Sequence, residues 1–115
     1  MRVTRVVPNV AVRDVSAATT FYSDLLGLDI GMDHGWIGTC VGDQSAVQLS
    51  VITEDATAPV NPVISVGVDD IEEAYRRATA AGLEIVHPLT DEPWGVRRFF
   101  LRDPDGNVIN IVAHR

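Results

Sequence analysis

The amino-acid sequence predicts an α+β fold in which two βαβββ modules follow one another along the chain. The first observation is an internal repeat: Val12-Arg13-Asp14 returns as Val68-Asp69-Asp70, and Gly27-Leu28-Asp29-Ile30 returns as Gly82-Leu83-Glu84-Ile85. The offset is about 56 residues, which is the length of one supersecondary unit. The second observation is that each copy places one helical pattern among strand-like runs. One helix cannot cover both faces of a sheet, so the other face must curve over a cavity or meet a partner.

The first strand and helix are set by composition and capping. Residues 3–13 are rich in β-branched side chains, and Pro8 predicts an edge position, a bend or a bulge because proline donates no ladder hydrogen bond. Asp14 is a good N-cap, and Gly27 is a good helix end. Apolar residues recur between them at helical spacing, and we expect them to form the buried stripe: Val15, Ala18, Phe21, Tyr22 and Leu25.

Three strands and a linker complete the first module. The strands are predicted at residues 28–33, 35–41 and 45–52, separated by glycine-containing turns. Residues 53–62 have no apolar periodicity and predict a linker.

The second module repeats this order. A strand at 63–68 precedes a helix capped by Asp69 or Asp70, and Gly82 ends that helix. A strand at 83–87 and a loop follow. The helix is expected to bury a stripe made of Ile71, Ala74, Tyr75, Ala78 and Ala81.

A hairpin is predicted at the end of the sequence. Residues 95–102 and 108–112 have strand composition, and residues 103–107, Asp-Pro-Asp-Gly-Asn, form the turn. Asn110 lies between two isoleucines, so its side chain points to the opposite face of the sheet. We look for a binding site on that face.

Composition limits the classes of partner. The 115 residues correspond to one domain, and a net charge of −7 argues against nucleic-acid binding. Cys40 is the only cysteine, so it forms no intrachain disulfide, and on a strand it is expected to be a small buried hydrophobe. No apolar run is long enough for a membrane span, and the first residues lack a signal-peptide pattern. We therefore expect a cytoplasmic protein with no membrane partner.

Two motifs resemble those of a known superfamily. They are Phe-Tyr-Ser-Asp-Leu-Leu-Gly-Leu at residues 21–28, and Trp-Gly-Val-Arg-Arg-Phe at residues 94–99 followed by the turn at 103–107. They are similar to signatures of the vicinal oxygen chelate superfamily, which includes glyoxalase I, extradiol dioxygenases, fosfomycin resistance enzymes and bleomycin resistance proteins. The resemblance implies a single domain, with modules at 1–56 and 60–115, whose mixed sheet half-closes around a cleft. It also implies a homodimer with clefts built across the subunit interface.

The resemblance further locates the positions that bind metal in metal-using members. They place a histidine on the first strand of each module and a glutamate on the last. Carried over by motif spacing, these positions are Val7, Gln48, Val63 and Asn110. Valine has no donor atom, and amides are poor ligands for divalent transition metals. We therefore expect no metal and no cofactor, and metal-polarised chemistry would lack its electrophile.

Six residues are candidates for contacting a ligand: Trp94, Trp36, Gln48, Asn110, Arg98 and Phe100. Tryptophan can stack a planar ligand or a cation, although either tryptophan could instead pack in the core or an interface. The two amides could orient a ligand, or they could hydrogen-bond each other or a water molecule within the fold. Arg97 and Arg98 could clamp an anion or pair with surface acids, and we favour a surface acid for Arg102.

No catalytic residue is identified from the sequence. His34, His87 and His114 are expected to be exposed, and no spacing pairs any of them with a nucleophile. Asp91 and Glu92 would suit a cationic ligand, but loop acids are usually solvated, so we expect both to be solvated.

The resemblance favours a binding protein of the bleomycin-resistance type. It would sequester a small, partly aromatic ligand in a dimer cleft without metal, as in antibiotic resistance or self-protection. The alternative is a glyoxalase- or dioxygenase-like enzyme with a non-standard metal site or metal-free acid–base chemistry. A third possibility is a module whose exposed sheet face binds another chain.

Overall fold

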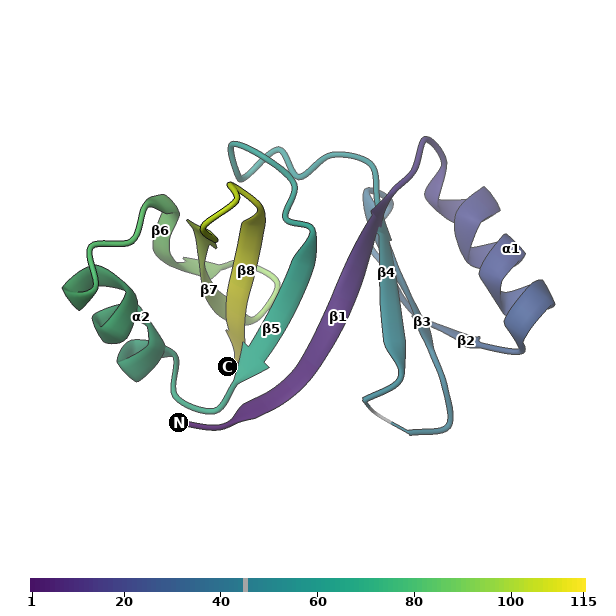
Figure 1. Ribbon diagram of the computed structural model, residues 1–115. Helices are drawn as coiled ribbons and strands as arrows, with labels where there is room; N and C mark the ends of the chain where they lie inside the picture. Colours follow the sequence, from purple (N-terminus) through teal and green to yellow (C-terminus); the bar gives the residue numbers. More distant parts are fainter. Residues whose placement is uncertain (45) are drawn as a thin grey trace. The chain divides into compact units, whose positions relative to one another are not determined.

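The computed structural model describes residues 1–44 and 46–115, and these form eight strands and two helices in two compact units (Figure 1). The N-terminal unit consists of residues 7–61, and the C-terminal unit consists of residues 1–6 and 62–115. Strand β1 (Val3–Ala11) begins in the C-terminal unit and ends in the N-terminal unit. The order of elements confirms the predicted α+β class and the repeated βαβββ pattern.

The N-terminal unit has an open mixed sheet in the order β2-β3-β4-β1, with β1 parallel to β4 and the other pairs antiparallel. The three strands after the helix are the predicted ones, but each begins later than predicted; the predicted start of the third, residue 45, lies outside the described residues. The elements that follow β1 are α1 (Val15–Leu26), β2 (Asp29–Asp33), β3 (Ile37–Val41) and β4 (Gln48–Ile52).

Helix α1 has the predicted ends but not the predicted buried stripe. The Asp14 side chain accepts a hydrogen bond from Ala17 N at 3.0 Å, and Gly27 closes the helix at φ 71°. However, Phe21 and Leu25 are exposed, so the prediction that they are buried is wrong. The helix is anchored through its first turns instead, where Val15 and Thr19 are buried. They lie so close to Gly38 of β3 that a Cβ there would be 2.9 Å from each.

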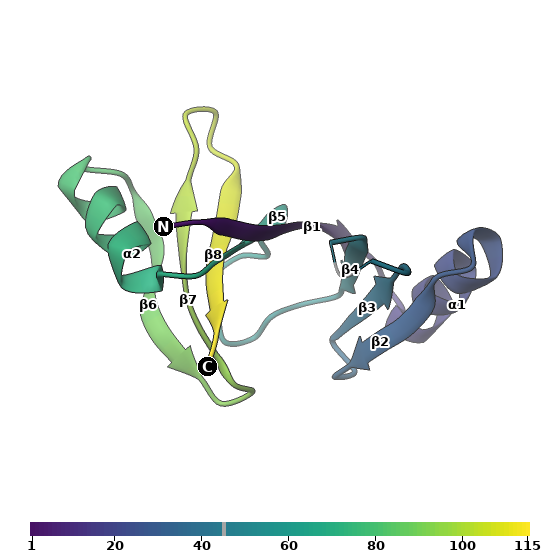
Figure 2. The ribbon, with the colours of Figure 1, turned by 90° about the horizontal axis from the view of Figure 1, so that it is seen from below.

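The C-terminal unit has the sheet order β1-β5-β8-β7-β6, with β5 parallel to β8 and the β6-β7-β8 pairs antiparallel. Figures 1 and 2 show α2 lying against one face of this sheet. Its elements after β1 are β5 (Ile64–Val68), α2 (Ile71–Ala80), β6 (Ile85–Glu92), β7 (Val96–Arg102) and β8 (Val108–His114).

Strand β6 is longer than predicted. The sequence predicts a loop after residue 87, but residues 88–92 continue the strand as far as Glu92. Pro88 is tolerated because β6 is an edge strand and the pairing shifts register between His87 and Thr90. This irregularity changes which later side chains point to which face.

The core of the C-terminal unit lies between α2 and the sheet. Helix α2 is capped by Asp70, whose side chain accepts a hydrogen bond from Glu73 N at 3.1 Å. Phe99 of β7 is fully buried, and its ring meets Tyr75 edge-on with 4.9 Å between centroids. The α2 residues in or packed against this core are Ile71, Ala74, Tyr75 and Ala78, which confirms most of the predicted stripe.

Alternation along β7 and β8 separates two faces of this sheet. Phe99 pairs with Ile111, and both face α2, whereas Phe100 pairs with Asn110 on the opposite face. The register is held by the predicted turn, in which the Asp103 carboxylate accepts hydrogen bonds from Asn107. We call the side opposite α2 the helix-free face. Neither described helix is long and apolar enough to cross a membrane.

We predict that Phe99→Ala lowers the free energy of unfolding by about 3–5 kcal/mol, because it leaves a cavity in a fully buried site. The matched control is Phe21→Ala, which removes the same ring from a side chain that is 57% exposed and should cost less than about 1 kcal/mol. Urea denaturation followed by circular dichroism measures both. Equal losses would contradict this assignment of the core.

Candidate functional site

The helix-free face of the C-terminal unit carries a cluster of buried polar side chains. The exposed fraction is 9% for His87, 6% for Glu92, 5% for Arg98 and 8% for Asn110, and Ser65 beside them is half-buried. Strands β5, β6, β7 and β8 each contribute at least one of the five residues. We call them the buried polar cluster. Burying such groups is costly unless they are paired. A cluster of them is therefore unusual and marks a candidate site.

Arg98 is the centre of the cluster. Its Nη2 donates a hydrogen bond to Glu92 Oε2 at 2.5 Å. The guanidinium carbon lies 4.9 Å from the centroid of the Trp94 ring and 4.8 Å from that of Phe100. A guanidinium at these distances is stabilised by both ring faces. The structure thus brings three of the predicted ligand contacts together, but it makes Glu92 the partner of the arginine.

The burial of His87 and Glu92 differs from the prediction. Both were predicted to be exposed to solvent, and both are buried. The reason is the extension of β6, which carries both side chains on the helix-free face on either side of the register shift. The only signal in the sequence was Pro88 inside a strand-like run, which is typical of a bulge.

The His87 ring packs against Phe100, with 5.2 Å between centroids. Its Nε2 is 3.9 Å from Glu92 Oε1, which is beyond hydrogen-bond distance. Among the described residues this nitrogen has no hydrogen-bond partner. The imidazole therefore presents a buried polar atom that a ligand or a water molecule could satisfy.

Asn110 presents a second such atom. Its Nδ2 donates to Ser65 Oγ at 2.9 Å, so this half of the amide bonds within the fold, to a serine that the sequence analysis did not name as a partner. Its Oδ1 is buried and has no hydrogen-bond partner in the part of the chain that the structure describes. A buried carbonyl oxygen without a donor is destabilising unless something supplies one.

Trp36 and Gln48 lie in the N-terminal unit. Gln48 begins β4 and pairs with Val41, whereas Trp36 precedes β3, next to the Ile37–Ile52 pair at the other end of the same ladder. At about 3.3 Å per residue, the two are roughly 15 Å apart along the strands. The structure therefore does not bring these two candidates together.

The last strands of the two repeats are shifted relative to the sequence alignment. The helix N-caps are 56 residues apart, so Asn9 corresponds to Ser65. Asn9 pairs with Ser50, and Ser65 pairs with Asn110. Ser50 is thus the ladder equivalent of Asn110, two residues from the aligned Gln48. A two-residue shift keeps a side chain on the same face.

The four residues that motif spacing assigns to the family's metal positions do not fit a metal. Within the N-terminal unit they are Val7, which is 4% exposed, and Gln48; within the C-terminal unit they are Val63 and Asn110. Each pair therefore contains one side chain with no donor atom and one neutral amide. Among residues 1–44 and 46–115, no three histidine, cysteine or acidic side chains group together as a metal site would require.

Other candidate side chains are engaged outside the cluster. Arg97 Nε is 2.8 Å from Glu72 and its Nη1 is 3.0 Å from Asp91, which places Asp91 in a surface network. Arg102 pairs with Glu84 at 2.6 Å, which confirms a surface acid as its partner. Cys40 is buried as predicted, and burial raises the pKa of its thiol.

Similarity to a known protein family covers nearly the whole chain. The family model described as Glyoxalase/Bleomycin resistance protein/Dioxygenase superfamily matches residues 2–111. No curated protein matches the chain.

Solved structures share the fold. A superfamily member from Vibrio splendidus 12B01 has a TM-score of 0.71 at 22% identity, covering 97% of this chain and 99% of that one. An NAD-dependent benzaldehyde dehydrogenase structure from Legionella pneumophila has a TM-score of 0.76 at 17% identity, with 96% and 99% covered. Methylmalonyl-CoA epimerase from Mycobacterium tuberculosis has a TM-score of 0.70 at 19% identity, with 98% and 87% covered. At these identities the likeness is one of fold alone.

We predict that Arg98→Met lowers the free energy of unfolding by about 3–5 kcal/mol, because it leaves the Glu92 carboxylate buried without its counter-charge. The control is Arg97→Met, whose ion pairs are solvent-exposed, so its loss of stability should be much smaller. The double variant Arg98→Met/Glu92→Gln should lose less than the sum of the two single variants. Additive losses in urea denaturation would argue against coupling between the two side chains.

Proposed function

Since the chain belongs to the glyoxalase/bleomycin resistance protein/dioxygenase superfamily, we propose that it is a binding protein for a small, partly aromatic molecule. The observation that carries the proposal is the buried polar cluster. Among the described residues, His87 Nε2 and Asn110 Oδ1 have no hydrogen-bond partner, and both belong to this cluster beside Trp94 and Phe100. A few convergent polar groups among aromatic side chains are typical of ligand sites.

The chemistry of these groups defines the ligand class. Asn110 Oδ1 accepts only, so the ligand must offer a donor such as an amide N–H or a hydroxyl. His87 Nε2 can accept or donate according to its tautomer. The charge of Arg98 is already matched by Glu92, so the ligand needs no net charge. An aromatic ring carrying an amide or hydroxyl group meets these requirements, with its ring against Trp94.

The proposed role is sequestration without metal, as in bleomycin-type resistance proteins. The support is the donor set at the family's metal positions, where valine stands in each unit. Trp36 and Gln48 remain proposed contacts for the ligand, and the binding form is proposed to be a homodimer in the cytoplasm. Because the fold alone assigns no function, we infer the ligand class from the hydrogen-bonding groups of the buried polar cluster.

A metal-free enzyme is the second candidate, favoured by one observation. His87 Nε2 and Glu92 Oε1 are 3.9 Å apart inside the cluster, so a bound substrate could exchange a proton with the imidazole while the carboxylate stabilises its charged form. Turnover of the bound compound, lost in His87→Gln while binding is kept, would favour this reading over sequestration.

We predict that metal-free bleomycin or a panel of aromatic amides quenches the fluorescence of Trp94, because the ligand ring stacks on the indole. The measurement compares the unmodified chain with the Trp94→Phe variant, in which the part of the quenching that comes from Trp94 should be lost. Asn110→Leu in the otherwise unmodified chain should weaken binding about tenfold, since it removes the buried acceptor. Phe21→Ala, far from the cluster in sequence and exposed, should leave the affinity unchanged.

The outcome that contradicts sequestration without metal is stoichiometric metal. The protein is incubated with Ni²⁺, Zn²⁺, Mn²⁺ or Fe²⁺, desalted, and analysed for bound metal. One equivalent retained per chain, and lost in Asn110→Leu, would replace this proposal with a non-standard metal enzyme.

A further inference from the structure

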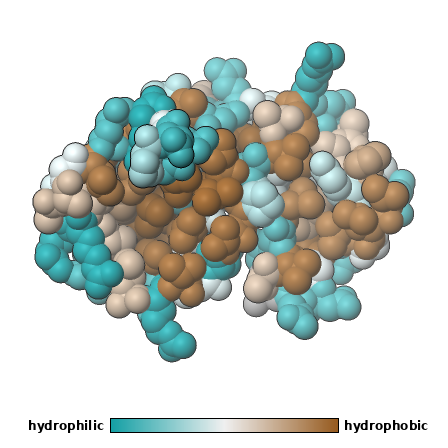
Figure 3. Space-filling model, in the orientation of Figure 1, coloured by the Kyte–Doolittle hydropathy of each residue, from teal (hydrophilic) through white to brown (hydrophobic). Residues whose placement is uncertain are grey.

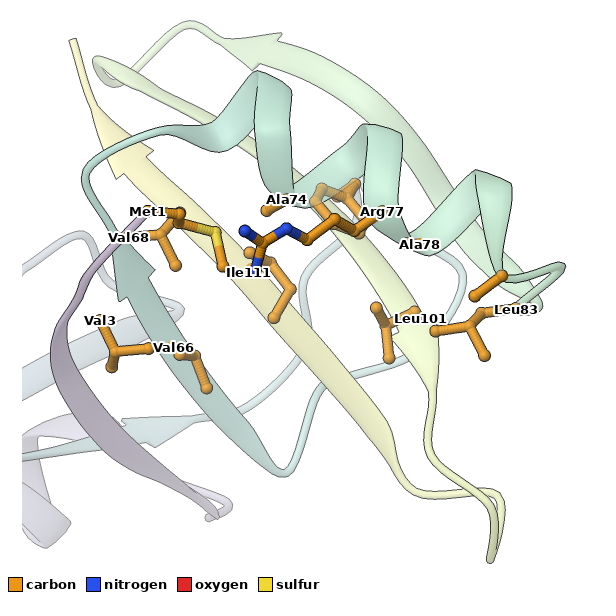
Figure 4. A pocket seen from close by; sticks show the side chains of 12 residues that line it. Met1, Val3, Val66, Val68, Ala74, Arg77, Ala78, Leu83, Leu101 and Ile111 are labelled. Atoms are coloured by element: carbon orange, nitrogen blue, oxygen red, sulfur yellow. The ribbon is translucent and has the colours of Figure 1, made fainter.

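An apolar groove lies on the other side of the same sheet, between α2 and the strands of the C-terminal unit. It has a volume of about 390 Å³, and eleven of its twelve lining residues are apolar. Figure 4 shows Val66, Leu101 and Ile111 along the strands, facing Ala74 and Ala78 of the helix. Apolar surface gathers over this part of the molecule in Figure 3. The groove is separate from the buried polar cluster, whose side chains point to the helix-free face.

The groove exists because α2 presents small side chains to the sheet. Ala74, Ala78 and Ala81 line it, and their spacing along the helix places them in one row. Larger side chains at these positions would fill the space between helix and strands. The row of alanines thus leaves room for a narrow apolar chain lying along the helix.

Among the described residues that line the groove, Arg77 is the one with a charged side chain, and this side chain reaches over the groove toward Val68 and Ile111 (Figure 4). Its Nε donates to Glu73 Oε1 at 3.0 Å, and its two terminal nitrogens have no partner among the described residues. Each of these two nitrogens carries two of the five guanidinium hydrogens, so together the nitrogens can bind a carboxylate through two parallel hydrogen bonds.

Arg77 shares its carboxylate partner with a second arginine. Glu73 also accepts two hydrogen bonds from Arg76, at 2.9 and 2.6 Å, so one carboxylate serves two guanidinium groups. These bonds, first from Arg76 and then from Arg77, lower the pKa of Glu73 to about 2 and keep it ionised at neutral pH. The chain as a whole carries a charge of −7, so attraction for an anion must be local to this helix.

We propose that the groove binds a medium-chain aliphatic carboxylate. The alkyl chain lies along the alanine row, and the carboxylate pairs with the terminal nitrogens of Arg77. The volume is in the range of small-molecule sites, and the apolar lining beside a cation matches a ligand with an apolar chain and an anionic end. This site is independent of the ligand proposed for the buried polar cluster.

The test is titration of the purified protein with decanoate, followed by calorimetry. Affinity should rise about fourfold for each methylene from hexanoate to decanoate, as expected for burial of an alkyl chain. Arg77→Met should weaken decanoate binding at least tenfold while leaving decanol binding unchanged. Arg76→Met removes an equivalent charge from the same Glu73 without touching the groove, and should change decanoate affinity less than twofold. Ala81→Phe should weaken both ligands.

Three results would overturn the proposal. The first is an affinity that does not depend on chain length. The second is an equal effect of Arg76→Met and Arg77→Met, which would indicate a general surface charge. The third is a dimer in sedimentation equilibrium that Ala81→Phe dissociates and decanoate does not, because a second copy would then cover the groove.

Discussion

The buried ion pair between Arg98 and Glu92 is the constraint on which the helix-free face depends. Removing two charges from water is unfavourable unless their geometry and surroundings compensate. Here the pair is joined by a 2.5 Å hydrogen bond, and the guanidinium lies over the rings of Trp94 and Phe100. This arrangement requires β6 to continue past Pro88 to Glu92, and it requires the turn after β6 to return Trp94 over the strand that carries Arg98.

Two adjacent residues on β7 have different roles, one in the core and one in the candidate site. Phe99 and Phe100 are both fully buried, but alternation sends them to opposite faces. Phe99 packs with Tyr75 under α2 and holds the core. Phe100 covers Arg98 and His87 and shapes the polar cluster. Strand β7 therefore contributes to both the core of the C-terminal unit and its candidate site. A one-residue change in its register would exchange the two faces.

Local signals in the sequence predict most of the fold. Asp14 and Asp70 cap their helices and residues 103–107 form the turn, because capping and turn chemistry depend on near neighbours. The burial of Glu92 was not predictable, since it follows from a register shift in strand pairing. The exposure of Phe21 also depends on packing, as helical periodicity does not show which turns meet a sheet. Of the candidate site, Trp94, Arg98, Phe100 and Asn110 are found together, whereas the roles of His87 and Glu92 were missed.

The central claim is that the helix-free face holds a site completed by a hydrogen-bonding ligand. A crystal structure at high resolution tests it most directly. We predict ordered solvent or a small molecule within about 2.7–3.2 Å of both His87 Nε2 and Asn110 Oδ1, with Trp94 at its edge. Side chains or backbone of the same chain bonded to both atoms, with no space beside Trp94, would contradict it.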